Sequence, residues 1–278
     1  MWTDGASGRV VGAVVRRELR IWSRYPSWII SLIVWPLLFP LVYLFGGRAL
    51  AGPGGEGMAA FAASAGTANV AGFIVVGTTA WMWLNITLWG VGTSLRMDQV
   101  KGVLESNWLT PASRFAMLLG TAASQAVIAL VFLGLSLLEF QLVLGIRFTP
   151  SAAGTLAVMA LTVPWLYGLG MAFAAVVLRF KEANAMVYFV RGLFMIFAGI
   201  TFPLAALPSW MREVAAALPL TYTIDGLRQA LLAGAGPSAL APQLLVLAGS
   251  GAALMALGYA LFQAMDRYMR RAGSLAHH

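Results

Sequence analysis

Long apolar runs alternate with short polar segments along most of the chain. A transmembrane helix needs about 20 consecutive apolar residues. Six runs approach or exceed that length, at residues 28–45, 70–95, 115–144, 152–178, 185–202 and 240–264. The run at 185–202 is barely long enough, whereas 115–144 is long enough to tilt or protrude. The pattern predicts an all-α membrane protein with six transmembrane helices, and we expect residues 1–278 to form one transmembrane domain.

The segment before the first run has a different periodicity. At the helical period, residues 8–25 gather one apolar face, formed by Val11, Val15, Leu19 and Trp22. The opposite face carries Arg16, Arg17, Arg20 and Arg24. This arrangement predicts an interface helix that lies on the membrane, with its arginines toward lipid phosphates. A solvated helix ahead of the membrane is the alternative.

Composition supports a membrane protein and excludes several kinds of site. Hydrophobic residues make up 60% of the chain and charged residues 10%, too few to cover a water-facing surface. There is no cysteine, and the two histidines are the terminal His277 and His278, so we expect no metal site and no disulfide. The net charge of +8 could suggest nucleic acid. Because the arginines stand at the ends of apolar runs, a membrane surface with anionic lipids is the better partner.

The distribution of basic residues predicts the orientation. With both termini in the cytoplasm, most of the 18 lysines and arginines lie on the inner side. Those left outside are Arg48, Arg147, Arg212 and Arg228. Cytoplasmic loops carry such an excess as a rule. This count assigns Arg191 to the inner side, together with Arg179 and Lys181.

The longest polar segment between spans on that side is residues 96–114, RMDQVKGVLESNWLTPASR. Residues 97–107 suit one short helix in which Lys101 and Glu105 are spaced i,i+4, and Thr110-Pro111 ends it. A helix projecting below a bundle can dock another protein. A plain connector with a solvated charged face is the other interpretation.

Residues 200–234 cannot form a single span, because prolines and charges interrupt them. We expect two short helices outside the membrane or in its outer leaflet, the first capped by Ser209 and stopped by Pro219. Thr221 or Thr223 would cap the second, which ends at Gly234. The segment is either an external gate or a passive lid, and its candidate residues are Pro203, Pro208, Pro219 and Arg228.

Three polar residues inside the apolar runs are candidates for a transport path. Glu139 lies late in the third run, where it could line a path, pair with Arg147 or Arg228, or be solvated at the interface. Asn85 and Gln125 lie deeper, where they could bond between helices or touch a substrate. Trp81 and Trp83 point to different faces of the second span, so no single aromatic stripe is expected.

The chain lacks the signatures of an enzyme or a channel. A phosphate-binding loop requires a glycine before its lysine, and neither Lys101 nor Lys181 has one. No cluster of acids or serine–base pair suggests intramembrane catalysis, and the spans lack the polar rings of a passive channel.

Residues 101–105, KGVLE, followed by residues 109–114, LTPASR, resemble the loop between the second and third helices of ABC-2 type exporter permeases. The family pattern has threonine where Val103 stands here. The segments Phe202-Pro203, Leu207-Pro208, Leu218-Pro219-Leu220-Thr221-Tyr222 and Leu227-Arg228 are similar to recurrent elements of the same family. The likeness extends over nearly the whole chain.

The resemblance implies an N-terminal interface helix, six spans, cytoplasmic termini in the cell membrane, and a re-entrant segment between spans five and six. It implies that the loop docks onto a separate ATPase subunit, which binds ATP and Mg²⁺, through Asp98, Lys101, Gly102, Glu105, Thr110, Pro111 and Arg114. Two permeases, expected to be a homodimer, would export an amphipathic or hydrophobic, drug-like substrate. A lipid-linked polysaccharide or glycan is the alternative cargo.

Overall fold

The computed structural model describes residues 4–50, 56–180 and 183–272. Within these ranges the fold is all-α, and no strand occurs. The first half contains α1 (Asp4–Arg24), α2 (Pro26–Leu50), α3 (Glu56–Ala65), α4 (Val70–Gly90), α5 (Ser94–Val100), α6 (Leu104–Leu109) and α7 (Arg114–Leu144). The second half contains α8 (Ala152–Phe180), α9 (Ala183–Phe197), the 3₁₀ helix η1 (Leu204–Ala206), α10 (Ser209–Ala217), α11 (Pro219–Leu232) and α12 (Ala241–Ala272).

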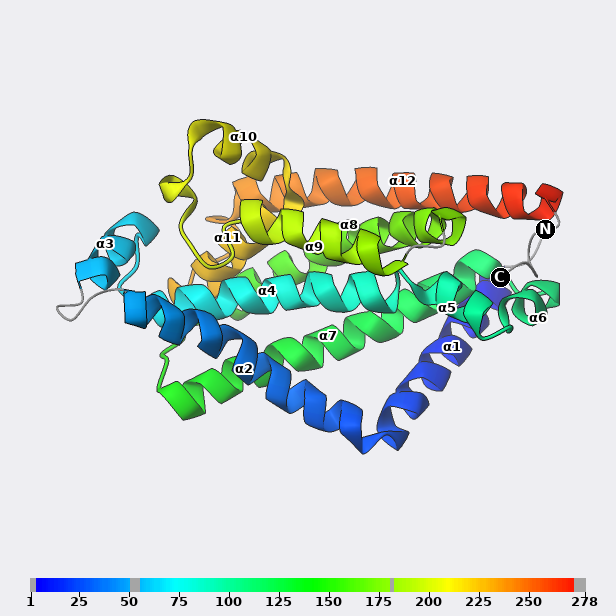
Figure 1. The fold of residues 1–278 in the computed structure, drawn as a ribbon, viewed down its shortest axis with the longest axis horizontal. Coiled ribbons are helices and arrows are strands. Elements are labelled where there is room, and N and C mark those ends of the chain that lie inside the picture. The colour runs from blue at the N-terminus through cyan, green and yellow to red at the C-terminus, as the bar shows by residue number, and fades with distance from the viewer. Residues whose placement is uncertain (1–3, 51–55, 181–182, 273–278) are drawn as a thin grey trace.

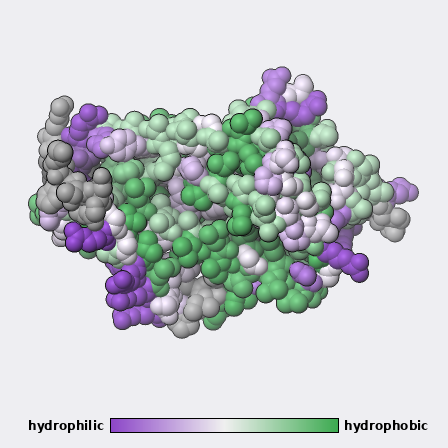
Figure 2. Space-filling model, turned by 180° about the vertical axis from the view of Figure 1, so that it is seen from behind, coloured by the Kyte–Doolittle hydropathy of each residue, from purple (hydrophilic) through white to green (hydrophobic). Residues whose placement is uncertain are grey.

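The long helices run lengthwise through an elongated bundle (Figure 1). One end carries α5 and α6, together with the start of α1 and the last turns of α12. The opposite end carries α3, α10 and α11. On the face shown in Figure 2, apolar residues cover the middle of the molecule, and hydrophilic residues gather toward its two ends. This is the surface that a bilayer requires.

Four stretches are long and apolar enough to cross a membrane: Val70–Val100, Arg114–Leu144, Ala152–Phe180 and Ala241–Met269. They match the second, third, fourth and sixth predicted spans. The first and fifth predicted spans correspond to shorter apolar stretches, Ile33–Ala49 and Ala183–Phe197. The full six-span layout therefore stays a prediction.

Several predicted boundaries were wrong. Helix α2, the first predicted span, begins at Pro26 rather than at residue 28 and continues to Leu50 rather than ending at residue 45, with Pro36 and Pro40 inside it. The fifth helix ends at Phe197 rather than at 202, and Gly199 follows with a φ of +66° that few other residues adopt. The last helix runs on to Ala272, eight residues past the predicted end. The N-terminal helix begins at Asp4 rather than at residue 8.

Local sequence explains where the third span begins and ends. Ser113 caps α7, and its hydroxyl oxygen accepts a hydrogen bond from the Ala116 amide at 3.3 Å. At the other end, Gly145 takes the left-handed conformation with φ +64°, which terminates the helix. The span therefore ends at Leu144, where the apolar run predicted its end.

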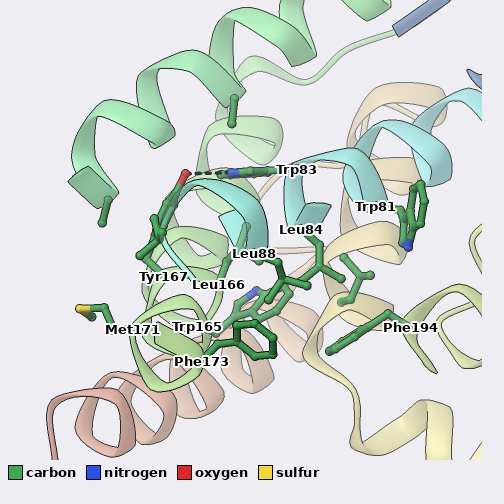
Figure 3. Packing of buried hydrophobic residues seen from close by; sticks show 14 of the residues in the cluster. Trp81, Trp83, Leu84, Leu88, Trp165, Leu166, Tyr167, Met171, Phe173 and Phe194 are labelled. Atoms are coloured by element: carbon green, nitrogen blue, oxygen red, sulfur yellow. Dashed lines mark hydrogen bonds between the residues drawn. The ribbon is translucent and has the colours of Figure 1, made fainter. Parts of the chain in front are cut away.

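The core forms around α4 and α8. In the most apolar 18-residue stretch of Val70–Val100, 83% of the residues are buried inside the protein. The corresponding stretch of α12 has only 17% of its residues buried, so α4 is central and α12 is peripheral. Figure 3 shows Leu84 and Leu88 of α4 near Trp165 and Phe173 of α8. Helix α12 is held closely to α8 through glycines.

The N-terminal helix packs mainly on α7 rather than standing apart. Val14 is buried against Gly120 of α7. A Cβ added at Gly120 would stand only 2.6 Å from the Val14 side chain. Leu19, predicted on the apolar face that rests on the membrane, is exposed on the protein surface. Arg16 and Arg20 line a shallow hollow on the outer surface, and Arg24 is exposed. Arg17 instead faces α5, so the four arginines do not form one uniform face.

Candidate functional site

The segment between α4 and α7 is two short helices and not one. Helix α5 ends at Val100, and α6 begins at Leu104. Between them Gly102 has a φ of +70°, a conformation that interrupts the helix and that L-residues with a Cβ rarely adopt. The single helix predicted over residues 97–107 is therefore wrong, and the i,i+4 relation of Lys101 to Glu105 is lost. We refer to residues 94–113 as the α5–α6 loop.

The α5–α6 loop presents apolar side chains at its tip. Val100, Val103 and Leu109 are exposed, and Leu109 retains 80% of its surface. Lys101 and Gly102 are exposed beside them, while the Glu105 side chain lies outside the described part of the structure. Exposed apolar residues grouped at one end of a molecule are typical of a contact surface.

Both ends of this loop are fixed to other helices. Asp98 lines a small cavity of about 40 Å³ together with Arg17 of α1 and Asn107 of α6. Arg114 forms an ion pair with Asp266 near the end of α12, at 2.5 Å between Nη1 and Oδ1. Thr110 and Pro111 are exposed between these anchors, and the Thr110 hydroxyl donates to the Asn107 carbonyl. The loop is thus connected to the first and last helices of the bundle.

A cavity of about 910 Å³ lies beside α4. Its lining from α4 and α5 follows one helical stripe: Trp81, Met82, Asn85, Ile86, Trp89, Gly90, Thr93 and Met97. Other helices contribute Glu18, Ile21 and Trp22 of α1, Trp35 and Phe39 of α2, Gln125 of α7, and Ala183, Asn184 and Arg191 of α9. At 1.5 Å per residue the stripe extends about 24 Å. We call this space the aromatic cavity.

Two of the predicted transport-path residues, Asn85 and Gln125, meet in the aromatic cavity. The Asn85 side-chain oxygen is buried and has no hydrogen-bond partner in the described structure. Gln125 packs against Gly90, where a Cβ would lie 2.5 Å from the glutamine amide carbon. Gly90 therefore makes the space that Gln125 occupies. One interpretation of the sequence was that Asn85 and Gln125 form hydrogen bonds between helices. Neither residue forms such a bond in the described structure.

Arg191 is a cavity residue that the sequence reasoning missed. It was counted with the basic residues of the inner side, but it lies in the middle of α9. Its guanidinium carbon stands 4.9 Å from the Trp81 ring centroid and 5.5 Å from that of Tyr188. A charged residue inside an apolar run is by itself a functional signal, and its position within 185–202 could have identified it.

The tryptophans of α4 divide between the core and the aromatic cavity. Figure 3 shows Trp81 and Trp83 on different sides of the helix, as predicted. The Trp83 indole donates to the Tyr167 hydroxyl at 3.2 Å within the core. Trp81 stacks on Phe39 of α2, with ring centroids 4.8 Å apart and an interplanar angle of 12°. Of the three tryptophans of α4, Trp81 and Trp89 line the cavity.

Glu139 lies apart from the aromatic cavity and pairs with neither predicted arginine. Both carboxylate oxygens are buried without a described hydrogen-bond partner. Arg147 is exposed, and Arg228 bonds elsewhere. The predicted pairing is therefore wrong.

Arg228 of α11 connects α4 to residues 198–218, which follow α9 and which we call the anchored segment. Its Nη2 donates to the Ile200 carbonyl at 2.8 Å, its Nε donates to the Phe73 carbonyl at 3.2 Å, and its guanidinium covers the Phe73 ring. Burial lowers the pKa of Arg228 to about 9, although the nearby Asp225 carboxylate opposes the shift, and the side chain stays charged at neutral pH. Gly77 leaves room for this arrangement, because a Cβ there would lie 2.0 Å from the Ile200 oxygen.

The predicted caps of the two short helices were wrong, although the helices themselves exist. Pro208 is the N-cap of α10, so Ser209 is already inside the helix. Pro219 occupies the first turn of α11, where its missing N–H costs nothing, and Thr221 and Thr223 lie inside. The Thr221 hydroxyl donates to the Ala215 carbonyl and joins the two helices. Gly234, with φ +68°, follows the end of α11 as expected. Pro203 is buried just before η1.

The ionisable groups do not suggest a metal centre. Within residues 4–50, 56–180 and 183–272, no three histidine, aspartate or glutamate side chains gather closely enough to hold an ion. The candidate functional features of the described structure are the exposed α5–α6 loop, the aromatic cavity and the anchored segment after α9.

A sequence model of the ABC-2 type transporter family matches residues 9–232, which include the loop, the cavity and the anchored segment. The chain belongs to this family. It is therefore a multi-pass membrane protein and a permease of an ABC transporter, and membership implies an ABC ATPase partner. No curated protein matches the chain. Helix α12 lies beyond the matched residues.

Proposed function

We propose that this permease exports an amphipathic or hydrophobic, drug-like molecule from the cytoplasm, driven by ATP. The main support is the continuity of one helical stripe. The residues that line the aromatic cavity continue from Trp81 on α4 to Met97 on α5, and α5 is the first helix of the α5–α6 loop. A motion imposed on the loop would therefore reach the cavity through α5 and the short turn at residues 91–93 that joins it to α4.

In the proposed topology α2, α4, α7, α8, α9 and α12 cross the membrane, and both termini are cytoplasmic. The excess of arginine at the loop end supports this orientation. The start of α1, the end of α12 and the α5–α6 loop lie at one end of the bundle, as an even number of crossings requires (Figure 1). The arginines of α1 would then lie at the cytoplasmic lipid surface.

The ATPase subunit would bind at the α5–α6 loop and would carry the ATP and Mg²⁺. Val100, Val103 and Leu109 offer it an apolar contact, with the exposed Lys101 beside them. Since Arg114 is tied to Asp266, pressure on the loop would also move α12.

A second copy of the permease would complete the pump as a homodimer. The faces of α2 and α9 next to the aromatic cavity expose large apolar side chains, including Trp35, Tyr188 and Phe189. Burying them against another subunit would be favourable. The segment from Pro203 to α11, including Pro208, Pro219 and Arg228, would form the external gate over the path.

The cavity favours an amphipathic cargo over the lipid-linked glycan. Its polar lining is sparse, and a sugar chain would need many more hydrogen-bonding groups than Asn85, Gln125, Thr93 and their few polar neighbours provide.

The docking proposal is tested by ATPase stimulation in the reconstituted complex. Gly102→Pro imposes a φ near −65° where the chain needs +70°, and Glu105→Arg reverses a charge at the proposed contact. Both should abolish stimulation of the ATPase while membrane insertion stays normal. Arg212→Glu, a charge reversal on the exposed α10, is the control and should be silent. Normal stimulation and transport by the two loop variants would refute docking at this loop.

A further inference from the structure

The environment of Arg191 is unusual for a charge inside an apolar helix. Its Nε is buried without a hydrogen-bond partner in the described structure, and no described carboxylate lies within ion-pair distance of its guanidinium. Two aromatic rings, Trp81 and Tyr188, face the cation. Cation–π contacts offset part of the cost of burying a charge, but they leave N–H donors unused.

The other ionisable group of the aromatic cavity does not compensate Arg191. Glu18 lines the cavity from α1, but its carboxylate already accepts from Arg17, at 2.7 Å between Nη2 and Oε1. Among the described lining residues, Arg191 is thus a cation without a carboxylate partner, in a wall that is mostly apolar.

The walls suit a flat or branched apolar body. Trp35, Phe39, Trp81 and Trp89 contribute aromatic surface, and Phe39 and Trp81 are already stacked on each other. The volume of about 910 Å³ is in the range of about 300–1,000 Å³ typical of small-molecule sites. Asn85 adds a buried side-chain oxygen that can accept a hydrogen bond from a ligand.

We infer that the aromatic cavity binds an anionic amphiphile. The carboxylate, sulfonate or phosphate of such a molecule pairs with the Arg191 guanidinium, and its apolar body packs between the tryptophans of α2 and α4. A guanidinium suits these groups because it can offer two parallel N–H donors to two oxygens. The inference rests on the proposed transport function, since it names the substrate class of the same path. Both a small organic anion and an anionic phospholipid have this chemistry.

A pair of fluorescent probes tests the charge recognition directly. 8-Anilinonaphthalene-1-sulfonate and N-phenyl-1-naphthylamine share an arylaminonaphthalene body, and only the first carries an anionic group. Binding of each is measured to the full chain in nanodiscs of phosphatidylcholine. Arg191→Met should weaken binding of the sulfonate about tenfold or more and leave binding of the neutral probe unchanged. Arg191→Lys should retain part of the affinity, because it keeps the charge but not the planar donor pair.

Two further measurements complete the test. Arg212→Met removes an exposed arginine far along the chain and should change neither probe. Adding phosphatidylglycerol identifies the source of the anion: competition with the sulfonate indicates a membrane lipid, and absence of competition indicates a small organic anion. Equal sulfonate binding by the wild type and Arg191→Met, or equal loss of both probes, would overturn the inference. Because no ATPase is present, this binding result is independent of whether the loop docks one.

Discussion

At the scale of single residues, Arg228 is the contact on which the anchored segment after α9 most depends. Arg228→Met would leave the Phe73 and Ile200 carbonyls without their donor and would remove the cation from the Phe73 ring. We expect a loss of about 3 kcal/mol in the free energy of unfolding, because two hydrogen bonds to a charged donor would be lost and the buried Ile200 carbonyl would stay enclosed without this partner. Thermal unfolding of the purified protein in detergent measures this loss.

The matched control for this prediction is Arg212→Met on α10. Arg212 is exposed and has no described hydrogen bond, so its replacement should change stability by no more than about 0.5 kcal/mol. If the two variants unfolded at the same temperature, the anchoring role of Arg228 would be wrong.

The site residues differed in how far sequence could predict them. Asn85 and Gln125 were predicted because polar side chains stand out in apolar runs, and both line the aromatic cavity. Arg191 was missed because it was grouped with nearby loop charges, and its partners Trp81 and Tyr188 depend on how α4 and α9 pack. The hydrophobic periodicity of the sequence shows which face of a helix is apolar, but not which other helix packs against that face.

At the scale of elements, the break between α5 and α6 depends on the conformation of Gly102. Because nothing lies within 4 Å of a Cβ at this position, a substitution tests backbone strain without steric clash. Gly102→Val should lower stimulation of the ATPase, since a β-branched residue pays about 1–2 kcal/mol at positive φ. Gly102→Asn should retain more stimulation, because asparagine tolerates that region. Equal ATPase stimulation by the two variants would show that the positive φ at Gly102 is not required.

The contact between α8 and α12 depends on small residues. A Cβ at Gly168 would stand 2.6 Å from the backbone of Leu254, and one at Gly258 would stand 2.5 Å from the Gly168 carbonyl oxygen. Glycines at such contacts let helices approach closely in membranes. Gly168→Leu should therefore destabilise the protein by about 3 kcal/mol, measured by thermal unfolding and by monodispersity on gel filtration.

Gly134→Leu is the control for this contact. Gly134 lies on α7 with nothing within 4 Å of a Cβ, so a leucine there should be tolerated. If Gly168→Leu behaved like Gly134→Leu, the close approach of α8 and α12 would not contribute to the stability of the fold.

Most elements could be predicted from hydrophobic pattern, but their ends could not. The spans at 115–144 and 152–178 were predicted to within a few residues, because Ser113, Gly145 and the surrounding turns carry strong local signals. The caps at Ser209, Thr221 and Thr223 were wrong because Pro208 and Pro219 set the helix starts instead. Proline at the first turn and a threonine cap compete for the same place, and composition does not decide between them.

At the scale of the whole molecule, the all-α membrane fold and its grouping of charge could be predicted from composition. The α5–α6 loop, the start of α1 and the end of α12 occupy one end of the bundle, as their shared arginine excess had suggested (Figure 1). The aromatic cavity could not be predicted, because it lies between four or more helices that are distant in sequence. Pairing with a second copy stays a proposal based on the exposed faces of α2 and α9.

The orientation of the α5–α6 loop is the claim on which the whole account depends, because a cytoplasmic ATPase can act only from inside. The chain has no cysteine, so single cysteines at Lys101 and at Ala205, both exposed, report on the two ends of the molecule. A membrane-impermeant maleimide added to intact cells should label Ala205→Cys at once and Lys101→Cys only after permeabilisation. Labelling of Lys101→Cys in intact cells would contradict the account.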